Sequence, residues 1–115
     1  HWYSILDIRN DNREGFGDPS IIPTAAHHAY MFKNFSNYLV CVDSGEVIGF
    51  IGHVENDIRL ATKKTHQNKG VGKFMVEGFM EKFPNSSAKV KIDNESSRRL
   101  FESCGFRRKY YILEK

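Results

Sequence analysis

The spacing of apolar and polar residues between positions 38 and 62 predicts three β-strands. Apolar, β-branched and aromatic residues are concentrated in residues 38–42, 46–54 and 58–62. Asp43-Ser44-Gly45 separates the first two runs, and Asn56-Asp57 separates the second from the third. Turn residues of this kind between short apolar runs are typical of antiparallel hairpins. We therefore expect a hairpin followed by a third strand.

Helical periodicity dominates the segments on either side. Thr24 is suited to cap a helix that runs to about residue 35. Val71, Phe74, Met75 and Phe79 recur at helical spacing, which predicts an amphipathic helix over 70–82. Asn94 is a good N-cap for a further helix, and Gly105 is suited to its C′ position. The inner face of that helix is expected to consist of Ser97, Leu100, Phe101 and Cys104.

Four other segments complete the predicted order of elements. Residues 2–9 are apolar enough for a first strand, or for a strand running into a helix, and residues 11–23 indicate a loop or broken helix. Residues 88–93 alternate apolar and basic side chains, and residues 106–113 form a final apolar run. Both are predicted to be strands. The result is an α+β fold with a central mixed, mostly antiparallel sheet flanked by helices.

Composition limits the architecture and the class of partner. A chain of 115 residues is long enough for one core, so residues 1–115 are expected to form a single domain. No apolar run approaches the roughly 20 residues of a membrane-spanning helix, and no segment at the start is typical of a signal peptide. Cys41 and Cys104 lie in apolar contexts, which predicts free thiols in a reducing cytoplasm. The five histidines show no metal-ligand spacing, so no metal is expected.

The net charge of +3 is small, but its distribution is informative. No acidic residue occurs between Ile58 and Val76, a stretch that holds Arg59, Lys63, Lys64, Lys69 and Lys73. Such a stretch is either a solvated basic face or an anion site for nucleic acid or a phosphorylated ligand. The segment that follows favours the small ligand over nucleic acid.

A strand, a glycine-containing loop and a helix follow one another here, through Gln67-Asn68-Lys69-Gly70-Val71-Gly72-Lys73. The first N–H groups of a helix lack intrahelical partners and carry partial positive charge. Glycines at positions 70 and 72 would let a phosphate approach the backbone, and the lysines add charge. This pattern predicts a pyrophosphate site.

Two other phosphate-binding loops do not fit these residues. A Walker loop requires glycine at position 67 and serine or threonine after Lys73, but the chain has Gln67 and Phe74. The dinucleotide fingerprint requires glycine or alanine at position 75, where Met75 stands.

The pattern Gln67-x-x-Gly70-x-Gly72 resembles the acyl-CoA loop of the GNAT superfamily of N-acyltransferases. A second match follows it: Asn94-x-x-Ser97-x-x-Leu100-Phe101-Glu102-x-Cys104-Gly105-Phe106 is similar to the closing segment of that family. The resemblance covers about residues 38–115. It implies a GNAT fold, with residues 37–115 as the acyl-CoA-binding core and residues 1–36 as the acceptor side.

The resemblance also implies an activity and a set of binding residues. The activity would be direct transfer of an acetyl group from acetyl-CoA to a primary amine, without a covalent enzyme intermediate. Backbone N–H groups from Asn68 to Lys73 would hold the pyrophosphate. Leu60, Ala61 and Thr62 would meet the pantetheine arm and the thioester carbonyl, and Asn94 would contact the pantetheine or simply cap its helix. The cofactor-binding residues implied are Leu60, Ala61, Thr62, Gln67, Asn68, Lys69, Gly70, Val71, Gly72, Lys73, Asn94 and Phe101.

The catalytic residues are less determined by the resemblance. The family often has a tyrosine, assigned as the acid for the departing thiolate, where this chain has Phe101. Tyr110, Tyr111, a water or an unassisted thiolate would then complete the reaction, or activity has been lost. Asp57, Glu55 and His53 are candidates for accepting the proton of the amine.

The acceptor is expected to be recognised by the N-terminal third. Arg9-Asn10, Ile22 and His27-x-x-Tyr30 are similar to amino-sugar N-acetyltransferases, although Arg13 falls early and Tyr30 replaces the usual tryptophan. An amino sugar is therefore the first candidate, and a peptide or protein amine is the alternative. A CoA-binding module without turnover is the competing class. A homodimer is compatible with either.

Overall fold

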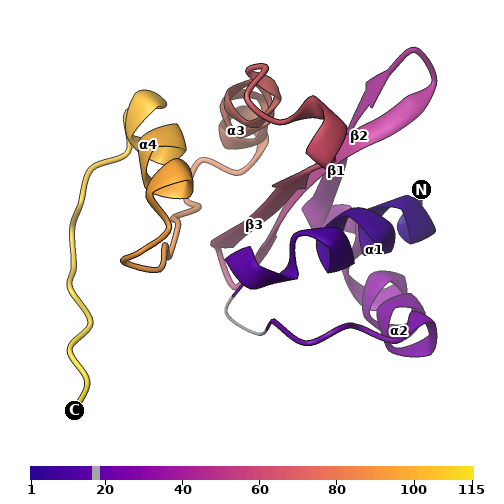
Figure 1. Ribbon diagram of the computed structural model, residues 1–115, viewed down its shortest axis with the longest axis horizontal. Helices are drawn as coiled ribbons and strands as arrows, with labels where there is room; N and C mark the ends of the chain where they lie inside the picture. The colour runs from indigo at the N-terminus through magenta and orange to yellow at the C-terminus, as the bar shows by residue number, and fades with distance from the viewer. Residues whose placement is uncertain (17–18) are drawn as a thin grey trace.

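A three-stranded antiparallel sheet forms the centre of the molecule (Figure 1). The computed structural model describes residues 1–16 and 19–115. The strands are β1 (Tyr38–Asp43), β2 (Glu46–Val54) and β3 (Asp57–Thr62), and their order in the sheet follows the chain. The three predicted strands and the α+β class are therefore confirmed.

Two tight turns set the register of these strands. Ser44 and Gly45 connect β1 to β2 with φ values of 51° and 80°, and Glu55 and Asn56 connect β2 to β3 with 51° and 68°. Two successive residues with positive φ are characteristic of the two-residue hairpin turn that matches the twist of antiparallel strands. The second turn lies one residue earlier than expected, so Asp57 is the first residue of β3.

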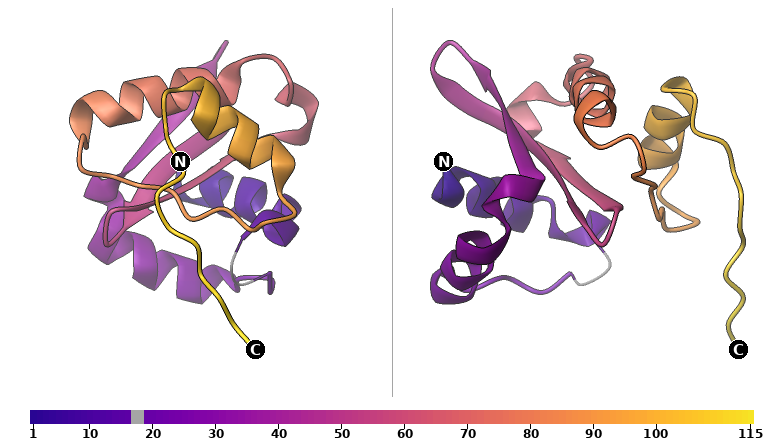
Figure 2. Two further views of the ribbon diagram at one scale, coloured as in Figure 1. Left: turned by 90° about the vertical axis from the view of Figure 1, so that its left-hand side faces the viewer. Right: turned by 180° about the vertical axis from the view of Figure 1, so that it is seen from behind.

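Two N-terminal helices cover one face of the sheet (Figures 1 and 2). They are α1 (Trp2–Asp11) and α2 (Thr24–Asn34), and α1 contacts β2, β3 and α2. The prediction of a strand over residues 2–9 is wrong. Ile5 and Ile8 are buried three positions apart while Asp7 between them is exposed, and this spacing serves a helix face. Pro23, rather than Thr24, is the N-cap of α2.

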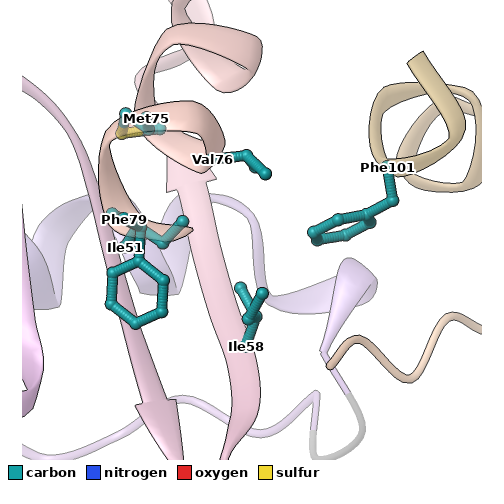
Figure 3. Close-up of a cluster of buried hydrophobic side chains, with 6 residues drawn as sticks. All are labelled: Ile51, Ile58, Met75, Val76, Phe79 and Phe101. Carbon is teal, nitrogen blue, oxygen red and sulfur yellow. The ribbon is translucent and has the colours of Figure 1, made fainter. Parts of the chain in front are cut away.

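The opposite face carries α3 (Val71–Lys82) and α4 (Glu95–Ser103). Their apolar faces meet the sheet in one cluster of buried side chains, drawn in Figure 3. The cluster consists of Ile51, Ile58, Met75, Val76, Phe79 and Phe101. Short 3₁₀ turns, η1 (Arg13–Gly15), η2 (Phe35–Asn37) and η3 (Lys64–His66), link the larger elements.

Both predicted caps of α4 are present. The Asn94 side chain accepts a hydrogen bond from the Ser97 N–H at 3.2 Å. At the other end Gly105 has φ 90°, its N–H donates to Glu102 O at 3.1 Å, and the Phe106 N–H donates to Phe101 O at 3.0 Å. This is the Schellman arrangement that the glycine predicts.

The structure does not contain the last two predicted strands. Of the chain after α3, only Ser87 joins the sheet, through an isolated parallel bridge to Asp57. Residues 88–93 then turn away, and Ile92 is 98% exposed. Residues 106–113 run beside α4 and away from the sheet (Figure 2). An alternating sequence makes a strand only where a neighbouring strand supplies backbone hydrogen bonds, and no strand among the described residues pairs its backbone with either segment. The expected mixed sheet is therefore antiparallel throughout its three strands, and its parallel pairing among the described residues consists of the bridge between Asp57 and Ser87.

Candidate functional site

The N-terminus of α3 has no side chain that caps it. Gly70 occupies the N-cap position in the left-handed region, with φ 82°, and its carbonyl accepts the Phe74 N–H at 3.1 Å. The N–H groups of Val71, Gly72 and Lys73 therefore have no partner among the described residues. Helix α4 differs, because the Asn94 side chain occupies its first turn. Unpaired N–H groups at a helix N-terminus bind anions.

The two loop glycines are required for different reasons. A Cβ on Gly70 would meet nothing within 4 Å, so its absence leaves the backbone open and permits the positive φ. A Cβ on Gly72 would lie 3.0 Å from Leu100 Cδ2. Gly72 therefore allows α4 to pack against the first turn of α3. The expectation that both glycines serve the approach of a phosphate is supported by this geometry for Gly70 alone.

Gln67 fastens the loop to two distant elements. Its Nε2 donates to Asn12 Oδ1 at 2.8 Å and to Thr62 O at 3.1 Å. Asn12 itself donates to Thr62 O at 3.2 Å and to Ile8 O at 2.8 Å. The loop is thus tied to the end of α1 and to the end of β3, so Gln67 serves to position the loop. Nothing in the sequence singled out Asn12 for this role.

The basic stretch is less uniform than its sequence suggests. Lys63 pairs with Glu46, and Arg59 pairs with Asp57. Lys69 and Lys73 are exposed beside the start of α3, and neither joins any of the ion pairs of the described residues. Two uncompensated ammonium groups thus stand beside the unpaired N–H groups, where they favour an anionic ligand.

The outer edge of β3 offers a second set of free backbone groups. The Ile58 N–H donates outward to Ser87 O at 2.8 Å. Backbone groups alternate in direction along a strand, so those of Leu60 and Thr62 also point outward. The Thr62 carbonyl already accepts from Asn12 and Gln67, but the Leu60 N–H and C=O have no partner in the described part of the chain. Ala61 points its backbone to β2 and buries its side chain.

Asn94 lies between the start of α4 and the 3₁₀ turn η1. Its Oδ1 caps α4 and also accepts from Ser96 Oγ at 3.2 Å. Its Nδ2 lies 3.7 Å from the position that a Cβ on Gly15 would occupy. Asn94 therefore serves as a helix cap, and its amide nitrogen faces η1.

Phe101 lies in the core and not at the loop. Its side chain is 7% exposed and points from α4 toward Ile58 and Val76 (Figure 3). Its ring centroid lies 5.1 Å from that of Phe106. These contacts explain Phe101 as a packing residue, so the structure gives no support to its role in cofactor binding.

The structure does not bring the three candidate catalytic residues together. Tyr110 is 81% exposed on the C-terminal segment. His53 packs its ring 4.9 Å from Phe83, and its Nδ1 accepts the Asn56 N–H at 3.3 Å. A neutral imidazole has one acceptor nitrogen, and in His53 that nitrogen is engaged. Asp57 lies 3.3 Å from Arg59 Nη2 and accepts the Lys89 N–H at 3.2 Å.

The residues of the expected acceptor pattern brace the N-terminal segment. Asn10 Oδ1 accepts the Ile22 N–H at 3.0 Å, and Arg9 Nη1 donates to Ser20 O at 2.6 Å. The His27 Nε2 lies 2.6 Å from Trp2 O, and burial lowers the pKa of this histidine. The Tyr30 and Tyr38 hydroxyls lie 2.8 Å apart, and burial, followed by this hydrogen bond, raises the pKa of Tyr38. These contacts hold α1, α2 and the sheet together.

A family model for the acetyltransferase (GNAT) family matches residues 2–106, which is nearly the whole chain. The chain belongs to the GNAT acetyltransferase family. This family consists of acyltransferases, and direct transfer is characteristic of it. No curated protein sequence matches the chain.

Solved GNAT structures share the fold. Ribosomal-protein-alanine N-acetyltransferase from Brucella melitensis superposes with a TM-score of 0.80 at 16% identity, over 92% of this chain and 78% of that one. A phosphinothricin acetyltransferase from Sinorhizobium meliloti in complex with AcCoA gives 0.79 at 18% identity, over 92% and 69%. An aminoglycoside 6'-N-acetyltransferase from Acinetobacter haemolyticus gives 0.68 at 15%, over 98% and 89%. At these identities the likeness shows the GNAT fold and not the acceptor.

Two further features are missing from residues 1–16 and 19–115. No helix there has the length and apolar character needed to cross a membrane. No group of three or more histidine, cysteine or acidic side chains there is arranged to hold a metal ion.

Proposed function

We propose that this GNAT acetyltransferase binds acetyl-CoA between the N-terminus of α3 and the outer edge of β3, and transfers the acetyl group to a primary amine. One observation carries the proposal. The uncapped N-terminus of α3 and the unpaired Leu60 backbone are separated only by a loop that Gln67 holds in place. An anion site and an open strand edge are thus joined in a single binding surface.

The residues present fit the two ends of acetyl-CoA. The N–H groups of Val71, Gly72 and Lys73, with the Lys69 and Lys73 ammonium groups, would hold the pyrophosphate. The Leu60 N–H and C=O would pair with the amides of the pantetheine arm as a neighbouring strand does. Acetyl-CoA supplies an activated thioester, whose carbonyl carbon is open to attack by an amine. An N–H aimed at that carbonyl oxygen would stabilise the charge that develops there.

The transfer requires two proton movements. The amine nitrogen forms a bond to the carbonyl carbon and loses a proton, and the C–S bond breaks to release a thiolate, which takes up a proton. We propose Asp57 as the acceptor of the amine proton, directly or through water. A carboxylate keeps lone pairs beyond those that face Arg59 and the Lys89 N–H, whereas the single acceptor nitrogen of His53 is engaged. Thiols have pKa values of about 8.5, so the thiolate can depart without a side-chain acid.

For the acceptor we prefer an amino sugar, with a peptide or protein amine as the alternative. The similar structures include enzymes named for ribosomal-protein alanine, phosphinothricin and an aminoglycoside, so the shared fold is compatible with each kind of acceptor. A reducing cytoplasm is the proposed location, since Cys41 and Cys104 are both free thiols.

A CoA-binding module without turnover is the second candidate. Two observations favour it: Phe101 has no proton to give, and Tyr110 is exposed on the C-terminal segment. One experiment separates the two functions. Acetyl-CoA at about 100 times its Kd should stabilise the fold by roughly 2.7 kcal/mol in either case. Release of free thiol on adding an amine panel would occur only with an enzyme, and the absence of any stabilisation would reject both.

A further inference from the structure

Arg59 is a half-buried arginine in the strand that carries the proposed thioester site. It lies opposite Gly52 of β2, and Gly52 in turn pairs with Tyr38 of β1. Ile58 and Leu60 pack on the side of α3, whereas Ala61 packs on the side of α1 and α2. Because side chains alternate along a strand, Arg59 projects toward the side of α1 and α2.

The ring of Tyr38 lies across Gly52, the residue that pairs with Arg59. A Cβ on Gly52 would lie 2.3 Å from Tyr38 Cδ1, so the ring of Tyr38 lies across Gly52 and toward the next strand. The Tyr38 hydroxyl is already joined to Tyr30 at 2.8 Å. Tyr38 therefore flanks the arginine with its ring, while its hydroxyl is engaged by another residue.

The hydrogen-bonding capacity of Arg59 is largely unused. A guanidinium carries five N–H donors. Nη2 lies 3.3 Å from Asp57 Oδ2, which is the one ion pair of this side chain among the described residues. Nε is buried without a partner, and Nη1 has none among the same residues. The other oxygen of Asp57 accepts the Lys89 N–H at 3.2 Å, so Asp57 is shared between two donors.

The position of Arg59 relates it to the acceptor. Consecutive Cα atoms are about 3.8 Å apart, so Arg59 adjoins Leu60, the residue proposed to face the thioester arm. Helix α3 packs on the other side of the sheet, and acetyl-CoA is proposed to lie along the outer edge of β3. An amine that attacks the thioester must approach from a direction that this cofactor leaves open, and the exposed 37% of the Arg59 side chain lies on the side of the sheet away from α3.

We propose, on the basis of the function proposed above, that Arg59 binds an anionic group of the acceptor, so that the substrate is an amine that also carries a carboxylate or a phosphate ester. The side chain is 37% exposed, which leaves its outer donors accessible. Arginine binds both anions through paired N–H donors. Arg59 is thus a specificity residue and takes no part in proton transfer.

Arg9, a second arginine on this side of the sheet, is engaged by other groups. Arg9 donates to Ser20 O and has its guanidinium carbon 4.9 Å from the centre of the Phe16 ring. Asp57 neutralises Arg59 only in part, because it also accepts from Lys89. Arg59, rather than Arg9, therefore has guanidinium donors available to a ligand on this side of the sheet.

The test compares matched acceptors that differ in one anion. One arm uses glucosamine 6-phosphate and glucosamine, and the other uses 4-aminobutyrate and its amide. In the native chain we expect the anionic member of at least one pair to have a KM about tenfold lower, which corresponds to about 1.4 kcal/mol, because the arginine adds a charge-assisted contact. The arm that shows the difference identifies phosphate or carboxylate.

Three variants locate the effect. Arg59→Gln should abolish the preference by raising KM for the anionic acceptor, with KM for acetyl-CoA changing less than about threefold, and Arg59→Lys should restore part of it. Any change in kcat should be the same for both members of a pair, because both reactions lose the ion pair between Arg59 and Asp57. Arg99→Gln removes an exposed arginine of α4 that pairs with Glu95, and should change none of these values. Equal KM values within both pairs in the native chain, or a preference that survives Arg59→Gln, would overturn the proposal.

A second readout separates this proposal from the proposed function. The Nε–H signal of Arg59 in an NMR spectrum should shift when inorganic phosphate or 4-aminobutyrate is added, and chloride at the same ionic strength should leave it in place. If acetyl-CoA binds but no acceptor is turned over, a shift still supports the anion site while the enzymatic function is rejected. If the signal does not respond to either anion, Arg59 serves only to pair with Asp57 and the proposal is wrong.

Discussion

Gly72 in the first turn of α3 packs directly against Leu100 of α4. A Cβ on Gly72 would come within 3.0 Å of Leu100 Cδ2 and 3.3 Å of Leu100 Cδ1. The loop that is proposed to bind the pyrophosphate thus also fixes the position of the last helix. Substitutions at the two loop glycines should therefore have different consequences.

We expect Gly72→Val to destabilise the fold by about 1–3 kcal/mol, because its side chain would enter space filled by Leu100. Unfolding in urea would measure the loss. Leu100→Ala provides the control, since it opens that space. The loss caused by Gly72→Val should be smaller in the Leu100→Ala background, and an equal loss in both backgrounds would show that the two residues do not interact.

Gly70→Asp should abolish binding of acetyl-CoA without displacing α4, because its Cβ meets nothing within 4 Å while its carboxylate would repel a pyrophosphate. Gly105→Asp is a matched control. Gly105 also has a positive φ, 90° against 82° at Gly70, but it follows α4 and lies outside the loop. Both variants should lose similar stability, and thermal shift with acetyl-CoA should be retained only in Gly105→Asp.

Gln67→Leu should weaken acetyl-CoA binding about tenfold, because the loop loses its ties to Asn12 and Thr62. Each of the two hydrogen bonds is worth roughly 1 kcal/mol, so the free energy of unfolding should fall by no more than about 2 kcal/mol. Asn12→Ala should have a similar effect. If the two act through one contact, the double variant should bind no more weakly than either single variant, as calorimetric titration can establish.

Phe101→Tyr should lower stability by about 1–3 kcal/mol and leave turnover unchanged. The added hydroxyl would enter a cluster of apolar side chains around Ile58 and Val76, where it leaves water without gaining a partner. Denaturant unfolding and the rate of thiol release would be measured on one preparation. A faster variant would show that the ring reaches the thiolate, and that a missing acid limits the native chain.

Stability should decrease as the pH falls below about 6.5, the ordinary pKa of histidine. Burial lowers the pKa of His27 in the folded chain, so the unfolded chain binds a proton first as the pH falls. The stabilising effect is therefore fully present above the unfolded pKa and is lost as the pH falls toward the folded one. His27→Gln keeps an N–H donor for Trp2 O but cannot titrate. Melting temperatures from pH 5 to 8 should fall less steeply at the acidic end in this variant.

The amino-acid sequence by itself determined the parts of the fold that depend on local chemistry. Asp43-Ser44-Gly45 and Asn56-Asp57 indicated the two hairpins, and Gly45 and Asn56 are residue types that tolerate positive φ, although the second turn begins one residue earlier, at Glu55. Asn94 and Gly105 bound α4 because a side-chain acceptor and a left-handed residue are what helix ends require. The loop pattern, together with the Asn94–Phe106 segment, was enough to indicate the family.

Tertiary structure alone decided features that depend on what lies opposite a residue. Residues 2–9 are as apolar as a strand, and only packing against β2 and α2 makes them a helix. Gly70 and Gly72 are alike in the sequence, but they differ in the folded chain. Gly72 packs against Leu100, whereas nothing lies within 4 Å of the position that a Cβ on Gly70 would occupy. In the sequence Arg59 is one of several basic residues, and only the folded structure shows that its Nε is buried without a partner. Local sequence fixes turns and caps through short-range contacts, whereas partners from distant segments exist only once the chain has folded.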